Sequence, residues 1–483
     1  MKGIKGINHI RESFKTRQVR YGGYAALITL AVIVGLVLVN LLVTQFSLQV
    51  DMTSSKLYSL SEQTVQVLDK VNTPVKFYGL WKPGEESQDV MPVINLYLAK
   101  NKNISLQVID PDKNPGFVAK YDKDKKGISR GSLIVEGPKG FRVIAPYDMY
   151  DFTQNQQGQS SVTGVSVERR ITSALLFAGT GNTPIVYELT GHNEIALSSL
   201  NMVDVVEREN YSVKSLNLLV APVPSDASAI IMNNPRRDLT AAEAQKLLDY
   251  LAKGGRFLVL ADYNIGDVTN LNNVLASYGI KLEYGIIHET DPNYVALDPR
   301  TEWPDLSDHD ITKPLADKSK TPVVLLQATA VSTLDTKRRS IEIKPLMTSS
   351  ARSFLRTNLS DTSAAKAAQD ISGPLTLAVA ATDPSWLDPN KPEPQARVVV
   401  IGCGNLLPIA MQGFDANRDI FMNSLTWIQD RPETISVRSK SLFMLPLRLN
   451  LVQLIIFGGL FIFIIPVAFF VIGFVTWLKR RHL

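Results

Sequence analysis

The sequence is poor in the residues that most often carry redox and metal chemistry. Its 483 residues include one cysteine, Cys403, and five histidines. A single cysteine excludes an intramolecular disulfide framework and a redox C-x-x-C pair. No H-E-x-x-H occurs, and neither does a Walker A or G-x-G-x-x-G motif. We therefore expect no resident metal, no bound nucleotide and no other cofactor.

Charged residues are missing from two long segments. Residues 24–46 and 451–478 contain no Asp, Glu, Lys or Arg, and each is longer than the roughly 20 apolar residues that cross about 30 Å of hydrocarbon. Both are predicted to be transmembrane helices in contact with membrane lipid. The tails, residues 1–23 and 479–483, are rich in Lys and Arg, so we expect both ends to be cytoplasmic and the large domain to lie outside.

The basic tails also account for the net charge. Together they carry more positive charge than the +5 of the whole chain. The residues between the spans are therefore net acidic, and no nucleic-acid partner is expected.

The part between the spans is long enough for two domains. Residues 55–180 are predicted to open with a helix capped by Ser59-x-x-Glu62. Residues 74–178 then follow the order β-α-β-α-β-β-α, which is typical of a thioredoxin-like domain, here without C-x-x-C. The sequence thus predicts an N-terminal α/β domain that has no redox activity.

Residues 181–437 alternate strands and helices with short connections, which predicts an open parallel α/β domain. Its best-defined unit is a βαβ segment whose helix has Thr240-x-x-Glu243 as a capping box. Residues 290–375 are irregular and are expected to be an insertion. Residues 438–450 are expected to link this domain to the second span.

The stretch "YELTGHNE", residues 187–194, ends a predicted strand and contains the candidate site: Gly191, His192, Asn193 and Glu194. Open α/β sheets bind ligands at the carboxyl ends of their strands, so a ligand- or partner-binding turn is one interpretation. Glu194 is expected in the first turn of a following helix. The alternative is structural, with Gly191 in a tight turn, Asn193 as a cap and His192 bonded to neighbouring loops.

The segment "IGCGNLL" resembles a G-x-C-x-G nucleophile elbow at the end of a strand. The elbow would need glycines where Ile401 and Asn405 stand. Cys403 is therefore interpreted as a small residue in a tight turn. A hydrolase or amidotransferase that uses Cys403 with His192 remains the alternative.

The chain resembles the GldG-like family, auxiliary and substrate-binding-like components of gliding-motility-type ABC transporters. The resemblance is carried, in order, by "YSLSEQTVQVLDKVNTPVKFYG", "LTGHNE", "NPRRDLTAAEAQKLLDYLAKGGRFLVLAD", "KPLMTSSARSF" and "RDIFMNSLTWIQD". It departs from the family pattern at Asn193, where a second glycine is usual. The resemblance implies an amidotransferase-like domain without catalytic residues and a protein of the bacterial cytoplasmic membrane that works with a separate permease and ATPase.

Three functions are consistent with these observations. The first is a non-catalytic transporter subunit whose spans contact the permease and whose outer domain handles or gates an envelope or extracellular substrate. The second is the membrane-tethered enzyme that would use Cys403 and His192. The third is a sensor or scaffold that binds an envelope polymer.

Overall fold

The structure is a computed structural model of the chain and divides into two compact units, residues 1–58 and 59–483. It describes the following residues: 24, 27–38, 59–123, 125, 127–154, 160–266, 268–316, 322–361, 363, 365–383, 395–430, 440–441 and 458–481. In the first unit, residues 27–38 form an exposed apolar helix. The other residues of the predicted first span, apart from residue 24, lie outside the described residues, and so does the predicted linker except for residues 440–441.

The first part of the second unit, residues 59–180, is here called the N-lobe. Its mixed sheet has the order β2-β1-β3-β4, in which β1 and β2 are parallel and the other pairs antiparallel. The strands are β1 (Val75–Gly79), β2 (Ile104–Val108), β3 (Leu133–Gly137) and β4 (Gly140–Ile144), and the helices among them are α4 (Val90–Lys100) and α5 (Pro115–Tyr121). As far as β4 this is the predicted order of elements, but the structure has two further strands before the last helix, where the prediction had none. The thioredoxin-like assignment stays a prediction.

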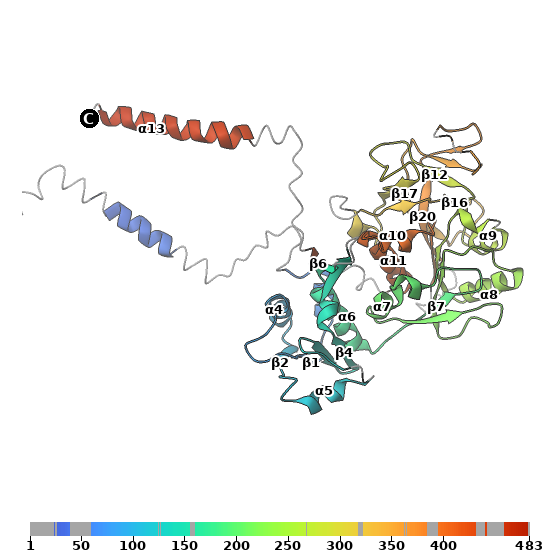
Figure 1. Ribbon diagram of the computed structural model, residues 1–483, viewed down its shortest axis with the longest axis horizontal. Helices are drawn as coiled ribbons and strands as arrows, with labels where there is room; N and C mark the ends of the chain where they lie inside the picture. Colours follow the sequence, from blue (N-terminus) through green and yellow to red (C-terminus); the bar gives the residue numbers. More distant parts are fainter. Residues whose placement is uncertain are drawn as a thin grey trace, which may run out of the picture. The chain divides into compact units, whose positions relative to one another are not determined.

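The N-lobe ends in the helix α6 (Val167–Thr180), which packs on β3 and β4 (Figure 1). Its first half is buried all round, and Gly181 ends it in the left-handed conformation that glycine adopts without strain. Before α6, the one-turn helix η1 (Pro146–Met149) leads into a second sheet of order β22-β6-β5. Its strands are β5 (Tyr150–Gln154), β6 (Ser160–Val165) and β22 (Lys440–Ser441).

The predicted cap of the first helix is wrong by two residues. Helix α3 (Glu62–Asp69) begins after Ser61, whose hydroxyl accepts a hydrogen bond from the Thr64 amide at 3.3 Å. A capping box needs its carboxylate in the third helical position, whereas Glu62 is the first residue of the helix. Ser59 therefore lies outside the cap.

Residues 183–430, here called the C-lobe, are built on an eight-stranded sheet of order β14-β17-β20-β21-β10-β9-β7-β8. Five neighbouring strands are parallel: β21 (Ala396–Ile401), β10 (Arg256–Leu260), β9 (Ala227–Asn233), β7 (Ile185–Leu189) and β8 (Ser212–Leu216). Antiparallel pairing adds β20 (Thr376–Asp383), β17 (Glu342–Thr348) and β14 (Asp305–Leu306). The predicted parallel core is thus extended by an antiparallel edge.

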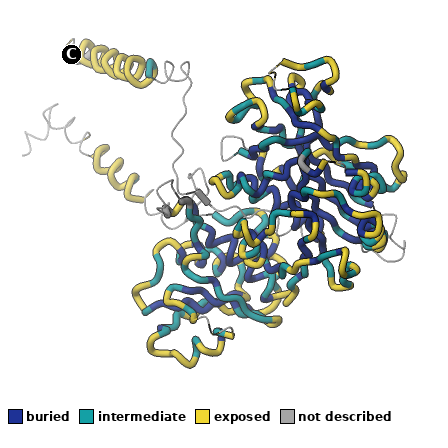
Figure 2. Tube along the Cα trace, turned by 45° about the vertical axis from the view of Figure 1, so that its right-hand side comes forward, coloured by how far each residue is buried: buried dark blue, intermediate teal, exposed yellow. Residues whose placement is uncertain are grey.

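Helices cover both faces of this sheet, which is why its inner parallel strands β9, β10 and β21 are mostly apolar, whereas the edge strand β8 is not. One face packs against α8 (Ala241–Ala252) and α9 (Thr269–Ala276). The other packs against α7 (Met202–Glu207), α10 (Leu406–Ala410) and α11 (Asp415–Ile428). In β9 the side chains of Ile230 and Ile231 belong to opposite faces. Figure 2 shows buried residues in the interior and exposed residues mainly at the periphery.

The region expected to be an insertion contributes to the central sheet. The strand β17 lies inside residues 290–375 yet pairs with β20, and β14 pairs with β17 in turn. Short strands make three further small sheets: β11 (Ile280–Leu282) with β16 (Val331–Thr333), β12 (Ile286–His288) with β18 (Phe354–Arg356) and β19 (Ile371–Ser372), and β13 (Thr301–Glu302) with β15 (Leu325–Leu326).

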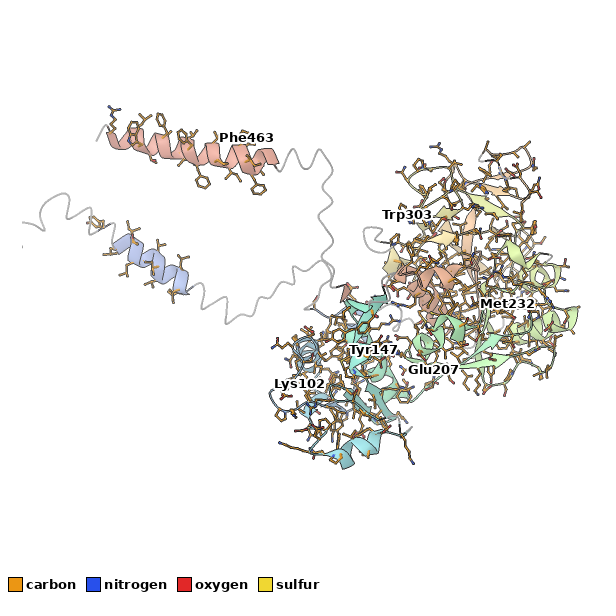
Figure 3. All side chains as sticks on the ribbon, in the orientation of Figure 1. Lys102, Tyr147, Glu207, Met232, Trp303 and Phe463 are labelled. Carbon is orange, nitrogen blue, oxygen red and sulfur yellow. The ribbon has the colours of Figure 1, made fainter. Side chains whose placement is uncertain are left out.

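A long apolar helix stands near the C-terminus. Residues Leu460–Leu478 are long and apolar enough to cross a membrane, and none of this helix is buried. It starts as a π-helical segment, η7 (Leu460–Ile464), and continues as α13 (Ile465–Arg481). Phe463 projects from it with two thirds of its surface exposed (Figure 3). Because exposed phenylalanine and isoleucine are unfavourable in water, this helix fits the predicted second span.

Candidate functional site

The candidate turn lies at the point where the sheet changes its direction of winding. After β7 the chain passes to β8 on one side, and then to β9 on the other side of β7. The connections that leave the carboxyl ends of β7 and β9 therefore run in opposite directions, and the place between them is here called the crevice. This is the topological switch point, at which open α/β sheets bind their ligands.

His192 is held between two carboxylates in this crevice. Its Nδ1 lies 2.8 Å from Glu194 Oε1, and its Nε2 lies 3.2 Å from Glu243 Oε1. The other oxygen of Glu194 accepts a hydrogen bond from the His192 amide at 2.7 Å. The side chains of all three residues are almost completely buried. We call His192, Glu194 and Glu243 the His192 clamp.

Glu243 is positioned by the cap of α8. The Thr240 hydroxyl accepts from the Glu243 amide at 3.3 Å, and Glu243 Oε2 accepts from the Thr240 amide at 2.9 Å, so the predicted capping box is confirmed. Its remaining oxygen, Oε1, faces His192. One glutamate thus both caps α8 and pairs with the turn after β7.

Backbone hydrogen bonds strengthen the same connection across the crevice. The His192 carbonyl accepts from the Arg236 amide at 2.8 Å, and the Ile195 amide donates to the Asn233 carbonyl at 3.0 Å. The Asn233 side chain donates back to the Ile195 carbonyl at 2.6 Å. The crevice is therefore closed by the protein's own groups in this structure.

The clamp has a defined electrostatic character. The hydrogen bond with Glu194 raises the pKa of His192 against the opposing effect of burial, and Glu243 adds to the rise. Burial would raise the pKa of Glu243, but hydrogen bonds from Thr240 and the His192 contact bring it below its usual range. The geometry therefore favours an imidazolium between two carboxylates.

The local structure after β7 differs from the prediction in one respect. Gly191 makes the tight turn at φ +122° and Asn193 has φ +58°. Glu194 is not in a helix, because residues 194–196 are irregular and the chain becomes helical at η2 (Leu197–Leu200), before α7. Glu194 turns back to bond His192 instead of facing a helix dipole, and Asn193 is not a helix cap.

Cys403 does not meet His192 in any described contact. Its side chain is fully buried, its thiol donates to the Leu326 carbonyl at 3.5 Å, and burial raises its pKa to about 12. A thiol in this state is a poor nucleophile, because the thiolate is the reactive form. The geometry agrees with a structural role in a tight turn.

Sequence reasoning missed two polar residues and a glycine at the same edge of the sheet. Asn234 follows β9 and Asp262 follows β10, and both are fully buried. A Cβ on Gly404, after β21, would lie 2.2 Å from Asn234 Oδ1 and 2.6 Å from Asp262 Oδ2. Neither polar atom of the Asn234 amide has a hydrogen-bond partner among the described residues. Their common position just after buried parallel strands was the available signal.

A hollow lined by described residues lies away from this edge. It is an open groove of about 720 Å³ between α8, α9 and residues 336–338. None of its lining residues belongs to the His192 clamp. Among the described residues, no group of three or more His, Cys, Asp or Glu side chains could hold a metal ion.

The fold defines the class first: a mixed α/β protein with an open sheet that carries a long apolar helix near its C-terminus. Residues 183–428, which span the C-lobe from just before β7 to the end of α11, match the model of the auxiliary family described as an ABC-type uncharacterized transport system. The chain belongs to this family, and it is an auxiliary component of an ABC-type transport system. Residues 54–150 match a domain of unknown function, DUF7088.

Comparisons with individual proteins add distant likenesses. The mmIFT52 N-terminal domain is 15% identical with a TM-score of 0.36, and the alignment covers 50% of this chain and 97% of that domain. A glutamine amidotransferase from Thermotoga maritima is 10% identical with a TM-score of 0.30, covering 52% of this chain and 99% of the other. Scores this low do not demonstrate a shared fold. No curated protein matches the chain.

Proposed function

We propose that this chain is a GldG-like, membrane-anchored subunit of an ABC transporter. Its apolar helices associate with a separate permease, which a separate ATPase drives. The two lobes lie outside the cytoplasmic membrane of a bacterium, where they handle or gate a substrate without catalysing a reaction. Both termini are cytoplasmic in this proposal.

The single observation that carries the proposal is the combination of family and helix. The family match over residues 183–428 assigns an auxiliary transport component, and the same chain carries the unburied apolar helix Leu460–Leu478. An exposed helix of this length and composition needs lipid or a protein partner within lipid. A permease is the membrane component that an ABC transport system offers.

The recognition site in this proposal is the turn Gly191, His192, Asn193 and Glu194. Its support is its position at the switch point and the clamp that closes the crevice there. A ligand or a partner loop that entered the crevice would have to replace the contacts of His192. Loss of this turn is therefore expected to affect recognition or coupling.

Recovery of partners from native membranes tests the proposal. Full-length chain with an affinity tag, solubilised in mild detergent, is expected to bring down an ATPase and a permease. Recovery of neither would contradict it. The enzyme alternative has its own test: it predicts that Cys403→Ser and His192→Ala each abolish function, whereas our proposal predicts that Cys403→Ser leaves function intact.

A further inference from the structure

The first turn of α6 contacts three separate parts of the chain. Glu168, Arg169 and Arg170 follow one another there, and each is at most 9% exposed. Consecutive charged residues on a helix point in different directions. Here Glu168 bonds the cap of α3, whereas Arg169 and Arg170 both bond Glu209.

The first contact is with the chain that follows the first predicted span. The Ser61 amide, at the cap of α3, donates to Glu168 Oε1 at 2.6 Å. One turn further along each helix, the hydroxyls of Thr64 and Thr172 lie 3.0 Å apart, and both residues are buried. The segment through which the N-terminal span joins the N-lobe is therefore bonded to α6.

The second contact is with the chain that leads to the C-terminal helix. Lys440 and Ser441 form β22 and pair with Val165 and Gly164 of β6. Val165 immediately precedes Ser166, the residue at the start of α6, whose hydroxyl donates to Asp151 of β5 at 2.9 Å. Both membrane-proximal connections thus meet the N-lobe at the same end of the same helix.

The third contact joins α6 to the C-lobe. Arg169 Nε and Arg170 Nη1 both donate to Glu209 Oε1, at 2.7 and 3.1 Å. The buried Asn210 side chain donates to the Ser173 carbonyl at 2.7 Å and to its hydroxyl at 2.8 Å. Removing one partner of a buried charged contact lowers the free energy of unfolding much more than removing one partner of an exposed pair.

Glu209 and Asn210 end the connection that begins at the candidate turn. The chain leaves β7 at residue 189, forms the turn with His192 and Glu194, passes through η2 and α7, and reaches Glu209 just before β8. One connection between neighbouring strands therefore has the His192 clamp at its start and the α6 contact at its end. A shift of α6 acts on the whole connection through these bonds.

We propose that α6 couples the membrane-proximal segments to the crevice at the switch point. Glu168 bonds the start of α3, which follows the N-terminal span, and β6 pairs with β22, which precedes the C-terminal helix. Arg169 and Arg170 bond Glu209, so a displacement of α6 displaces Glu209. The inference rests on the proposed function only in taking the apolar helices to move with a permease. The coupling itself is a property of this chain.

Hydrogen exchange of the full-length chain in lipid nanodiscs tests the coupling without any transporter partner. Glu209→Gln is expected to speed exchange of the amides of residues 191–195 by about tenfold or more, because the far end of their connection is released. Amides in β9 and β10 are expected to keep wild-type exchange. Asp204→Asn, an equal charge change at an exposed position of the same connection, is the matched control and is expected to behave as wild type.

A milder variant covers the case in which Glu209→Gln does not fold. Ser173→Ala removes one acceptor of Asn210 and is expected to speed exchange at residues 191–195 by a few-fold. Coupling is reciprocal, so His192→Asn is expected to speed exchange at the Ser61 amide. Folded Glu209→Gln or Ser173→Ala protein with wild-type exchange at residues 191–195 would overturn the proposal. That result would leave ATPase and permease recovery, and hence the proposed function, unaffected.

Discussion

A histidine between two carboxylates is the decisive feature at the scale of single residues. Burial alone would keep an imidazole neutral, but His192 contacts Glu194 at 2.8 Å and Glu243 at 3.2 Å. Protonation gives the ring a donor toward each carboxylate, because a neutral imidazole donates from one nitrogen. The Nε2–Glu243 contact is an ion-pair distance without the alignment of a hydrogen bond. The protonation state of the ring therefore contributes to how firmly the turn after β7 is held to α8, beside the backbone hydrogen bonds of the same connection.

The clamp predicts a pH dependence of stability. The pKa of His192 is raised in the folded chain, so its contribution is complete below the unfolded value of about 6.5 and is lost as the pH rises through the folded pKa. The difference in unfolding free energy between wild type and His192→Asn should therefore be constant below about pH 6.5 and shrink as the pH rises above it. Urea denaturation in detergent, followed by tryptophan fluorescence, measures it.

His288 provides the control, because its pKa is shifted in the opposite direction to that of His192. Burial lowers the pKa of His288, so His288 destabilises the folded chain on the acid side and is neutral in effect at high pH. The wild-type advantage over His288→Asn should accordingly grow as the pH rises from acid values to about 6.5, and it should stay constant above that pH. A wild-type advantage over His192→Asn that stays constant above about pH 6.5 would contradict this explanation of the clamp.

Substitution by alanine is expected to have opposite effects on stability at two glycines, Gly404 and Gly179. A methyl group on Gly404 would overlap Asn234 and Asp262, so Gly404→Ala should destabilise by about 1–3 kcal/mol. Gly179, within α6, has no atom within 4 Å of such a group, so Gly179→Ala should stabilise by roughly 0.5–1 kcal/mol. Thermal melting of both variants measures this, and a tolerated Gly404→Ala would show that the edge is not close-packed.

At the scale of elements, the sequence predicted those helix caps whose bonds join residues close together in the chain. Thr240 and Glu243 are three residues apart and form the predicted box. Glu194 is not helical because Glu194 and His192 bond each other in a turn, a competition that periodicity does not reveal. Ser61 and not Ser59 caps α3, because two serines stand close together and the helix starts after the second.

The cap of α8 offers a test at this scale. Thr240→Ala removes the hydroxyl that accepts from the Glu243 amide and should cost about 0.5–2 kcal/mol. Thr240→Ser keeps the hydroxyl and should stay close to wild type. Chemical denaturation of both variants decides the point, and equal losses would mean that the methyl group rather than the cap matters.

At the scale of the whole molecule, contacts distant in sequence were beyond prediction. The pairing of His192 with Glu243 joins residues of two different strand-to-helix connections. The strand β17 was expected in an insertion because residues 290–375 look irregular, yet it completes the sheet beside β20. The candidate turn could be placed at a strand end, but its clamp depends on the order of strands.

The whole-molecule account predicts that the apolar helix carries the partner contact. Replacing Leu460–Leu478 with an unrelated apolar span of equal length keeps a membrane anchor. It changes only the helix surface that a partner would contact within the membrane. ATPase and permease recovered per molecule of tagged chain should then fall at least tenfold. The folded state of the lobes, followed by their melting, should not change.

The most direct measurement of the central claim is this recovery from native membranes, compared between wild type and the span-replaced chain. We expect both an ATPase and a permease to co-purify with the wild type and to be lost with the replaced span. Recovery of neither protein with the wild type would contradict the claim that this chain is a subunit of an assembled ABC transporter.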